Sequence, residues 1–117
     1  GVSVAHTAGA VAGAVWPGGA VGVDVEAVIP YDRAAAEIAL MADEQRLVEA
    51  AADRADEFCR FWVRKEALGK ALGVGVDPVV LATPVAHASV SVGDARICLR
   101  DLDAPIGSRA ALAWILR

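Results

Sequence analysis

The longest helical pattern in the chain covers residues 55–72, and strand-like segments flank it towards both ends of the sequence. Apolar side chains recur along one face of this pattern at helical spacing: Phe58, Phe61, Trp62 and Leu68. Gly73 follows directly and is a natural stop, because glycine readily adopts the left-handed conformation that ends many helices. The segment therefore predicts an amphipathic helix that packs on another layer of structure.

Apolar and small residues alternate with a period of two in several shorter segments, which indicates strands. These segments are residues 2–5, leading to His6 and Thr7, the apolar run 10–16, and residues 21–26, 89–92, 95–100 and 109–116. Gly93 and Asp94 join two of them, and a Gly-Asp pair between strand-like runs is typical of a hairpin. These patterns favour a mainly antiparallel sheet.

Two shorter helices are expected before the long one. Asp32 is a suitable N-cap for a helix from Arg33 to about Met41, and Asp43 for a helix from Glu44 to about Ala52. Residues 74–88 are expected to form a loop. The order of strands, helices and strands predicts the α+β class, with helices packed on a mainly antiparallel sheet.

Length and composition narrow the function classes. A chain of 117 residues predicts one domain over residues 1–117, and its net charge of −4 argues against general nucleic-acid binding. No apolar run reaches the roughly 20 residues of a membrane helix. The hydrophobic fraction of 56% indicates either an alanine-rich core or an apolar interface with another chain or domain. Two distant cysteines and no signal peptide favour a cytoplasmic location.

The first candidate functional segment is G-V-D-V-E at residues 22–26. Asp24 and Glu26 are two apart on a strand, so their side chains point to the same face. Neighbouring carboxylates repel unless a positive charge lies between them, and Mg²⁺ prefers such oxygen ligands. The pair is therefore either a metal site or a solvated strand edge.

The second segment is W-V-R-K-E-A-L-G-K at residues 62–70. Trp62, Glu66 and Lys70 share one side of the predicted helix. Glu66 and Lys70 are either a surface ion pair or a third metal carboxylate with a lysine for phosphate. The third segment is His6-Thr7 at a strand end, where a lone histidine is either structural or a ligand contact. His87 is expected to be an exposed loop residue.

Together and in this order, the three segments resemble the surfactin-synthetase-type phosphopantetheinyl transferases, specifically their C-terminal half. That family shows a Ser-His-Ser-like segment, a G-[IV]-D-[IV]-E strand and W-x-x-K-E-x-x-x-K with trailing glycines. Here the segments are residues 5–7, 22–26 and 62–75, with Ala5 where relatives often carry serine. The wider 4′-phosphopantetheinyl transferase superfamily includes the holo-acyl-carrier-protein synthases.

The resemblance implies a Mg²⁺-dependent transfer of the 4′-phosphopantetheine arm of coenzyme A to a serine of an acyl or peptidyl carrier protein. It implies that Asp24, Glu26 and Glu66 coordinate Mg²⁺, and that Lys70 contacts phosphate and assists the serine. Either Glu66 or a water that it holds takes the serine proton. The remaining roles implied are coenzyme A contacts by His6, Thr7 and Lys65, and packing beneath the site by Trp62. Arg60 and Arg64 are either contacts of an acidic carrier helix or surface charges without a partner.

The chain matches one half of the two-half enzymes and begins at Gly1 without an initiator methionine. The smaller synthases build their sites between the subunits of a trimer, but those relatives lack the acid found here at Glu26. We therefore expect a chain that self-associates, a chain whose N-terminal half is missing, or a domain excised from a synthase. Two other interpretations stay open: a non-catalytic half that docks carrier protein, and an unrelated α+β binding domain.

Overall fold

The computed structural model describes residues 1–116, which form ten elements in the order β-β-β-α-α-α-α-β-β-β. The strands are β1 (Val2–Thr7), β2 (Ala10–Val15), β3 (Val21–Ala27), β4 (Ser89–Val92), β5 (Ala95–Leu102) and β6 (Ser108–Leu116). The helices are α1 (Arg33–Ala39), α2 (Ala42–Ala50), α3 (Arg54–Leu72) and α4 (Pro78–Leu81). The predicted α+β class is confirmed.

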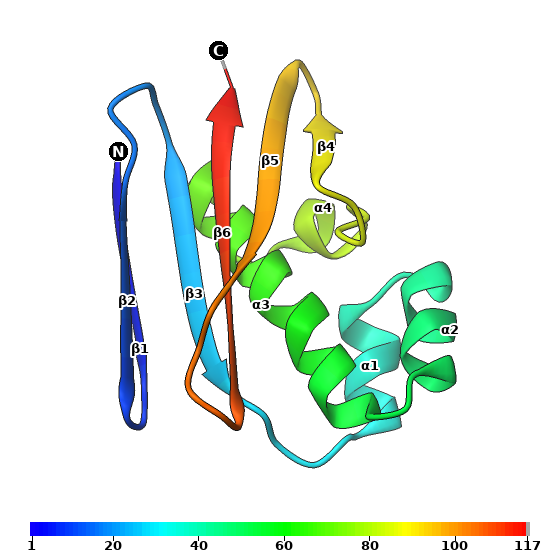
Figure 1. Ribbon diagram of the computed structural model, residues 1–117. Helices are drawn as coiled ribbons and strands as arrows, with labels where there is room; N and C mark the ends of the chain where they lie inside the picture. The colour runs from blue at the N-terminus through cyan, green and yellow to red at the C-terminus, as the bar shows by residue number, and fades with distance from the viewer. Residues whose placement is uncertain (117) are drawn as a thin grey trace.

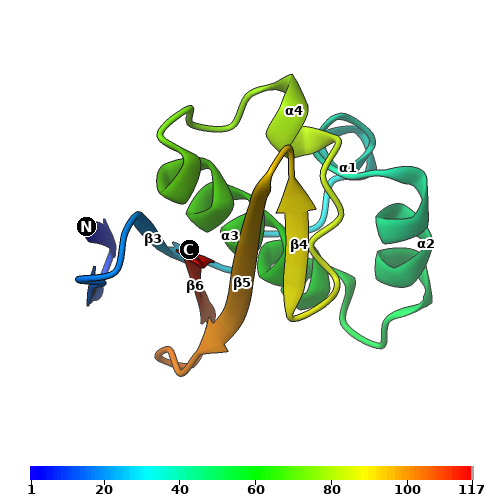
Figure 2. The ribbon, with the colours of Figure 1, turned by 90° about the horizontal axis from the view of Figure 1, so that it is seen from above.

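The strands form two antiparallel sheets, a hairpin of β1 and β2 and a four-stranded sheet of order β3-β6-β5-β4. Helix α3 lies along one face of the larger sheet, and the hairpin stands beside β3 (Figures 1 and 2). Helices α1 and α2 form a corner beside the N-terminal half of α3 (Figure 1). Strand β3 is therefore covered by the hairpin on one side and by α3 on the other.

The alternation in β3 explains this double cover. Val23 and Val25 pack into an apolar cluster with alanines of the hairpin, and Ser3 Oγ accepts a hydrogen bond from Val23 N at 3.0 Å. Gly22 faces α3, where a Cβ atom would lie 2.0 Å from Ala67 O. Only a residue without a side chain permits this close approach of strand and helix.

Helix α3 begins and ends close to where the sequence predicts. Asp53 Oδ1 accepts a hydrogen bond from Asp56 N at the start, and Gly73 adopts φ 74° at the end. The predicted hairpin at Gly93-Asp94 is also present, with Val92 paired to Ala95. These local signals are strong because the residues themselves favour caps and turns.

Three local predictions were wrong. Helix α1 ends at Ala39 rather than Met41, because Leu40 turns extended and buries its side chain. Helix α2 starts after Met41 instead of Asp43, because Glu44 Oε1 accepts the hydrogen bond of Met41 N. The predicted loop 74–88 contains α4, whose Val80 N donates to Asp77 Oδ1 at 2.9 Å.

Candidate functional site

The acids predicted from the sequence lie between β3 and the C-terminal half of α3. Asp24 and Glu26 come from β3, while Glu66 and Lys70 come from α3, one helical turn apart. Gly22 allows α3 to cross β3 so closely that the two elements present these groups to one another. The strand motif and the helix motif, distant in the sequence, therefore form one site.

Asp24 is the most deeply buried of these acids, with 4% of its surface exposed. Its Oδ1 lies 3.6 Å from Lys70 Nζ, whereas its buried Oδ2 has no hydrogen-bond partner among the described residues. Lys70 Nζ also donates to Val23 O at 2.9 Å, which holds the ammonium above the strand. Buried carboxylate oxygens without partners are rare, so the atom needs an explanation.

The electrostatics of the site follow from this burial. Burial, and after it the neighbouring charge of Glu26, raise the pKa of Asp24 to about 7, while Lys70 acts in the opposite direction. Burial and Glu26 also raise the pKa of Glu66, again against the effect of Lys70. The three acids therefore influence one another, and their shared negative charge is costly without a cation.

The residues fit a divalent metal. The donor set is made of carboxylate oxygens, which Mg²⁺ prefers, and the unpartnered Asp24 Oδ2 is free to act as a ligand. Among residues 1–116, however, no three His, Cys, Asp and Glu side chains are already grouped closely enough to hold an ion. Coordination by Asp24, Glu26 and Glu66 stays a prediction.

Thr7 and His6 lie on opposite sides of β1. Thr7 lines a groove of about 580 Å³ together with Glu26, so the structure brings it to the edge of the acid site. His6 is exposed on the outer face of the hairpin. The predicted coenzyme A contact of Thr7 thus fits its position better than that of His6.

Lys65 does not join the site. Its ammonium is fully buried and contacts Glu44 Oε1 at 2.7 Å, Leu81 O at 2.8 Å and Thr83 O at 3.0 Å. Three acceptors satisfy all the donors of a lysine ammonium. The predicted phosphate contact therefore does not fit this position, which is a structural one.

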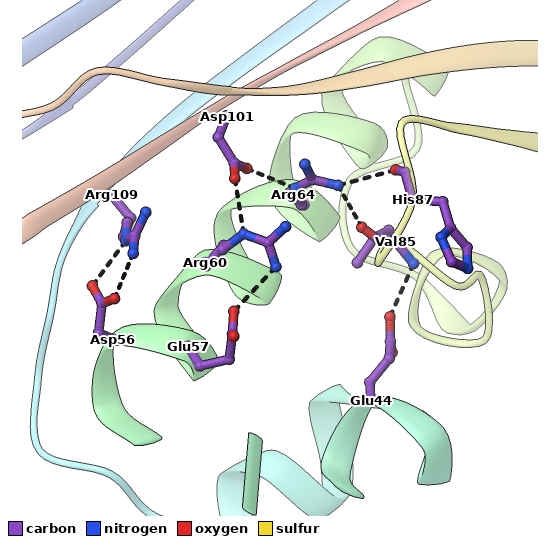
Figure 3. Close-up of polar contacts among 9 residues, drawn as sticks. All are labelled: Glu44, Asp56, Glu57, Arg60, Arg64, Val85, His87, Asp101 and Arg109. Carbon is purple, nitrogen blue, oxygen red and sulfur yellow. Dashed lines mark hydrogen bonds and ion pairs between the residues drawn. The ribbon is translucent and has the colours of Figure 1, made fainter. Parts of the chain in front are cut away.

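The arginines expected to meet a carrier protein are also engaged within the chain. Arg64 is buried and donates to Asp101, Val85 O and His87 O, while Arg60 donates to Asp101 and Glu57 (Figure 3). A carrier contact by Arg64 therefore does not fit the structure. The side chain of His87 is exposed as predicted.

The groove beside Glu26 was not foreseen from the sequence. Its walls come from β3 and the segment after it, from α1 and from the first half of α3, and they are mostly apolar. The lining side chains include Ile29, Ile38, Ala39, Phe58, Cys59 and Trp62. Trp62 also packs on the main core, in line with the expected structural role. The signal for this groove was weak, since apolar residues in α1 are equally typical of an ordinary core.

Comparison with known proteins identifies the class. Residues 20–112 match the family described as the 4′-phosphopantetheinyl transferase superfamily. This match covers most of the chain, including Asp24, Glu26, Glu66 and Lys70, while the hairpin with His6 and Thr7 lies outside it. The chain belongs to the 4′-phosphopantetheinyl transferase superfamily.

Solved structures share the fold at low sequence identity. The holo-[acyl-carrier-protein] synthase from Neisseria meningitidis superposes with a TM-score of 0.70 at 17% identity, over 84% of this chain and 98% of that one. The holo-[acyl-carrier-protein] synthase from Thermotoga maritima gives 0.63 at 20% identity, over 84% of this chain and 63% of that one. No curated protein matches the sequence.

Among residues 1–116, no helix has both the length and the apolar character needed to cross a membrane.

Proposed function

We propose that the chain transfers the 4′-phosphopantetheine arm of coenzyme A to a serine of an apo acyl or peptidyl carrier protein, in a Mg²⁺-dependent reaction that releases 3′,5′-ADP. The observation that carries the proposal is the unpartnered Oδ2 of buried Asp24, beside Glu26 and Glu66, in a chain of the phosphopantetheinyl transferase superfamily. A purely structural carboxylate at this depth would have a hydrogen-bond donor.

Each residue of the acid site has its own proposed role. Bound Mg²⁺ would supply positive charge that offsets the negative charge of the pyrophosphate. Asp24, Glu26 and Glu66 would hold it, and Lys70 would face a phosphate oxygen from the same side. Since phosphoryl transfer depends mainly on positioning and electrostatic stabilisation, these fixed charges account for most of the expected catalysis. Glu66, with its raised pKa, is suited to accept the serine proton directly or through water.

The complete site is proposed to form only when this chain associates with a second copy or with another half. The outer face of the hairpin exposes four valines, each more than 60% accessible: Val2, Val4, Val11 and Val15. The inner face of the same hairpin uses mostly alanine, so the larger apolar side chains point outwards, the reverse of a solvent-facing ribbon. Either a second copy of the chain or the other half of a two-half enzyme would cover this face.

The test is a direct assay of the carrier. The chain is incubated with Mg²⁺, coenzyme A and an apo carrier protein, and the intact mass of the carrier is measured. A gain of about 340 Da, lost with EDTA and in Asp24→Ala, supports the proposal. If the carrier is unmodified and coenzyme A also fails to bind in the presence of Mg²⁺, in every assembled form, the proposal is wrong.

A negative mass result with intact Mg²⁺-dependent coenzyme A binding has a different meaning. It would favour the alternative of a half that binds but needs a partner half for transfer. The oligomeric state, measured by light scattering for the parent and for Val4→Lys, then decides whether the exposed hairpin face supports association.

A further inference from the structure

Lys65 and Glu44 form an ion pair inside the protein. The ammonium of Lys65 is 0% exposed and the carboxylate of Glu44 is 2% exposed, and the two are 2.7 Å apart. Lys65 comes from the middle of α3, while Glu44 comes from the first turn of α2. Because a buried ion pair is often no more stabilising than apolar residues of the same volume, its value here lies in the geometry that it imposes.

Glu44 fixes the corner between α1 and α2. Its Oε1 accepts the hydrogen bond of Met41 N at 2.9 Å, and its Oε2 accepts that of Val85 N at 2.9 Å. Figure 3 shows Glu44 and Arg64 engaging the backbone of Val85 from two sides. Through Glu44, the buried pair connects α3, the α1–α2 corner and the segment that follows α4.

Both ends of this connection lie close in sequence to residues that line the groove beside Glu26. One wall is the end of α1, where Ala39 lies two residues before Met41. The opposite wall is α3, where Trp62 lies three residues before Lys65, close to one helical turn. The buried pair is thus linked to both walls through short stretches of the chain.

We infer that Lys65 and Glu44 are positioning residues that set the spacing between the α1 wall and the α3 wall of this groove. Among residues 1–116, neither side chain forms a hydrogen bond or ion pair with Asp24, Glu26 or Glu66. The spacing of the walls is independent of any activity. Its bearing on substrate entry, through Glu26 at the rim of the groove, rests on the proposed function.

Other contacts attach α2 to the core without involving Glu44 or Lys65. Tyr31 donates to Glu49 Oε1 at 2.7 Å and packs edge-on against Phe58, and Val48 is buried in the core. These contacts keep α2 attached when the pair is replaced. Loss of the pair should therefore loosen the α1 end locally and leave the remainder of the chain folded.

Cys59 provides a reporter inside the groove. It is 5% exposed and lines the α3 wall, and burial raises the pKa of its thiol to about 11. In a Cys98→Ser parent, the alkylation of Cys59 by iodoacetamide measures how often the groove opens. The double variant Glu44→Leu/Lys65→Met removes both charges together, so that no unpaired buried charge confounds the result.

We expect Cys59 in the double variant to react at least about tenfold faster than in the parent, with little change in global stability to urea. The matched controls are Arg46→Ala, which breaks an exposed pair on α2, and Val80→Ala, which truncates a fully buried core residue outside the groove. Arg46→Ala should leave the rate unchanged. Val80→Ala should raise it only as far as its loss of global stability explains.

Two outcomes would overturn the inference. The first is an unchanged Cys59 rate in a folded double variant, which would mean that the groove keeps its spacing without the pair. The second is a single relation between rate and global stability that includes both the double variant and Val80→Ala, which would mean that the pair acts only on overall stability.

Discussion

The ammonium of Lys70 lies 3.6 Å from Asp24 Oδ1 and donates its hydrogen bond to the carbonyl of the preceding residue, Val23. The lysine thus stands beside the carboxylate without fully neutralising it, and Asp24 Oδ2 has no partner among the described residues. This arrangement leaves a negative site that is incomplete by itself, and it makes the first two predictions possible.

Replacement of Asp24 by asparagine should change how the stability of the metal-free chain depends on pH. The raised pKa of Asp24, about 7 against an ordinary 3.8, means that the folded chain keeps a proton that the unfolded chain releases near pH 4. The free energy of unfolding should therefore fall as pH rises from about 4 to about 7. The loss should be of the order of 4 kcal/mol.

Urea unfolding in EDTA at several pH values measures this effect. Asp24→Asn should flatten the curve between pH 4 and 7, whereas Asp103→Asn at an exposed position should not. If the parent is equally stable across that interval, or if the variant keeps the same slope, then burial does not control Asp24 in the way described.

Magnesium should stabilise the parent chain, and more strongly at pH 8 than at pH 6. At the lower pH a proton on Asp24 competes with the ion, since its pKa is about 7. At a concentration 100 times the dissociation constant the gain would be about 2.7 kcal/mol. Thermal unfolding in MgCl₂ and in EDTA, at both pH values, provides the measurement. If Mg²⁺ stabilised Asp24→Asn and Glu66→Gln as strongly as it stabilises the parent chain, the ion would bind elsewhere.

The elements that the sequence predicts well are those whose signals are local. Gly73 fixes the end of α3 through its left-handed conformation, and the Gly-Asp turn fixes the β4–β5 hairpin. The two acid motifs also meet as expected, because Gly22 permits the crossing of α3 over β3. The helix end and the hairpin follow from residues whose conformational preference is independent of their tertiary surroundings, whereas the meeting of the acid motifs was implied by the family resemblance.

The sequence predictions fail where tertiary contacts determine the position of a helix end or a side chain. Asp43 has the chemistry of a cap, yet Glu44 caps the helix start because its carboxylate is already held by Lys65. Lys65 and Lys70 belong to one motif and look alike in sequence, but their different angles on α3 send one into the core and the other to the acids. No local pattern distinguishes a buried lysine such as Lys65 from one that faces the acids, because the acceptors of Lys65, such as Thr83 O, come from a distant segment.

Replacement of Gly22 by alanine should separate β3 from α3. The new Cβ would lie 2.0 Å from Ala67 O and 2.6 Å from Ala71 N, which are backbone atoms that cannot rotate away. Overpacking of this kind costs about 1–3 kcal/mol or more, and it should also displace Lys70 from Asp24. Urea unfolding measures the loss, and Gly13→Ala is the control, because its Cβ would have Ser3 O, at 4.0 Å, as its nearest neighbour among the described residues outside its own chain neighbours. Equal stability of the two variants would contradict the proposed close packing.

Replacement by methionine should affect the stability of the chain very differently at the two lysines of the helix motif. Lys65→Met leaves the Glu44 carboxylate buried and without its cation, so it should cost about 3–5 kcal/mol of stability. Lys70 has a side chain that is 34% exposed, so Lys70→Met should change stability by no more than about 1 kcal/mol.

Transfer activity should show the reverse order once folding is accounted for. Lys70→Met should slow phosphopantetheine transfer at least about 100-fold, because it removes a fixed positive charge from the site, and Lys70→Arg should restore part of the rate. Initial rates from intact carrier mass, measured on protein that circular dichroism shows to be folded, give the comparison. A Lys70→Met chain that transfers at the parent rate would remove Lys70 from the reaction, and a Lys65→Met chain as stable as the parent would remove Lys65 from the core.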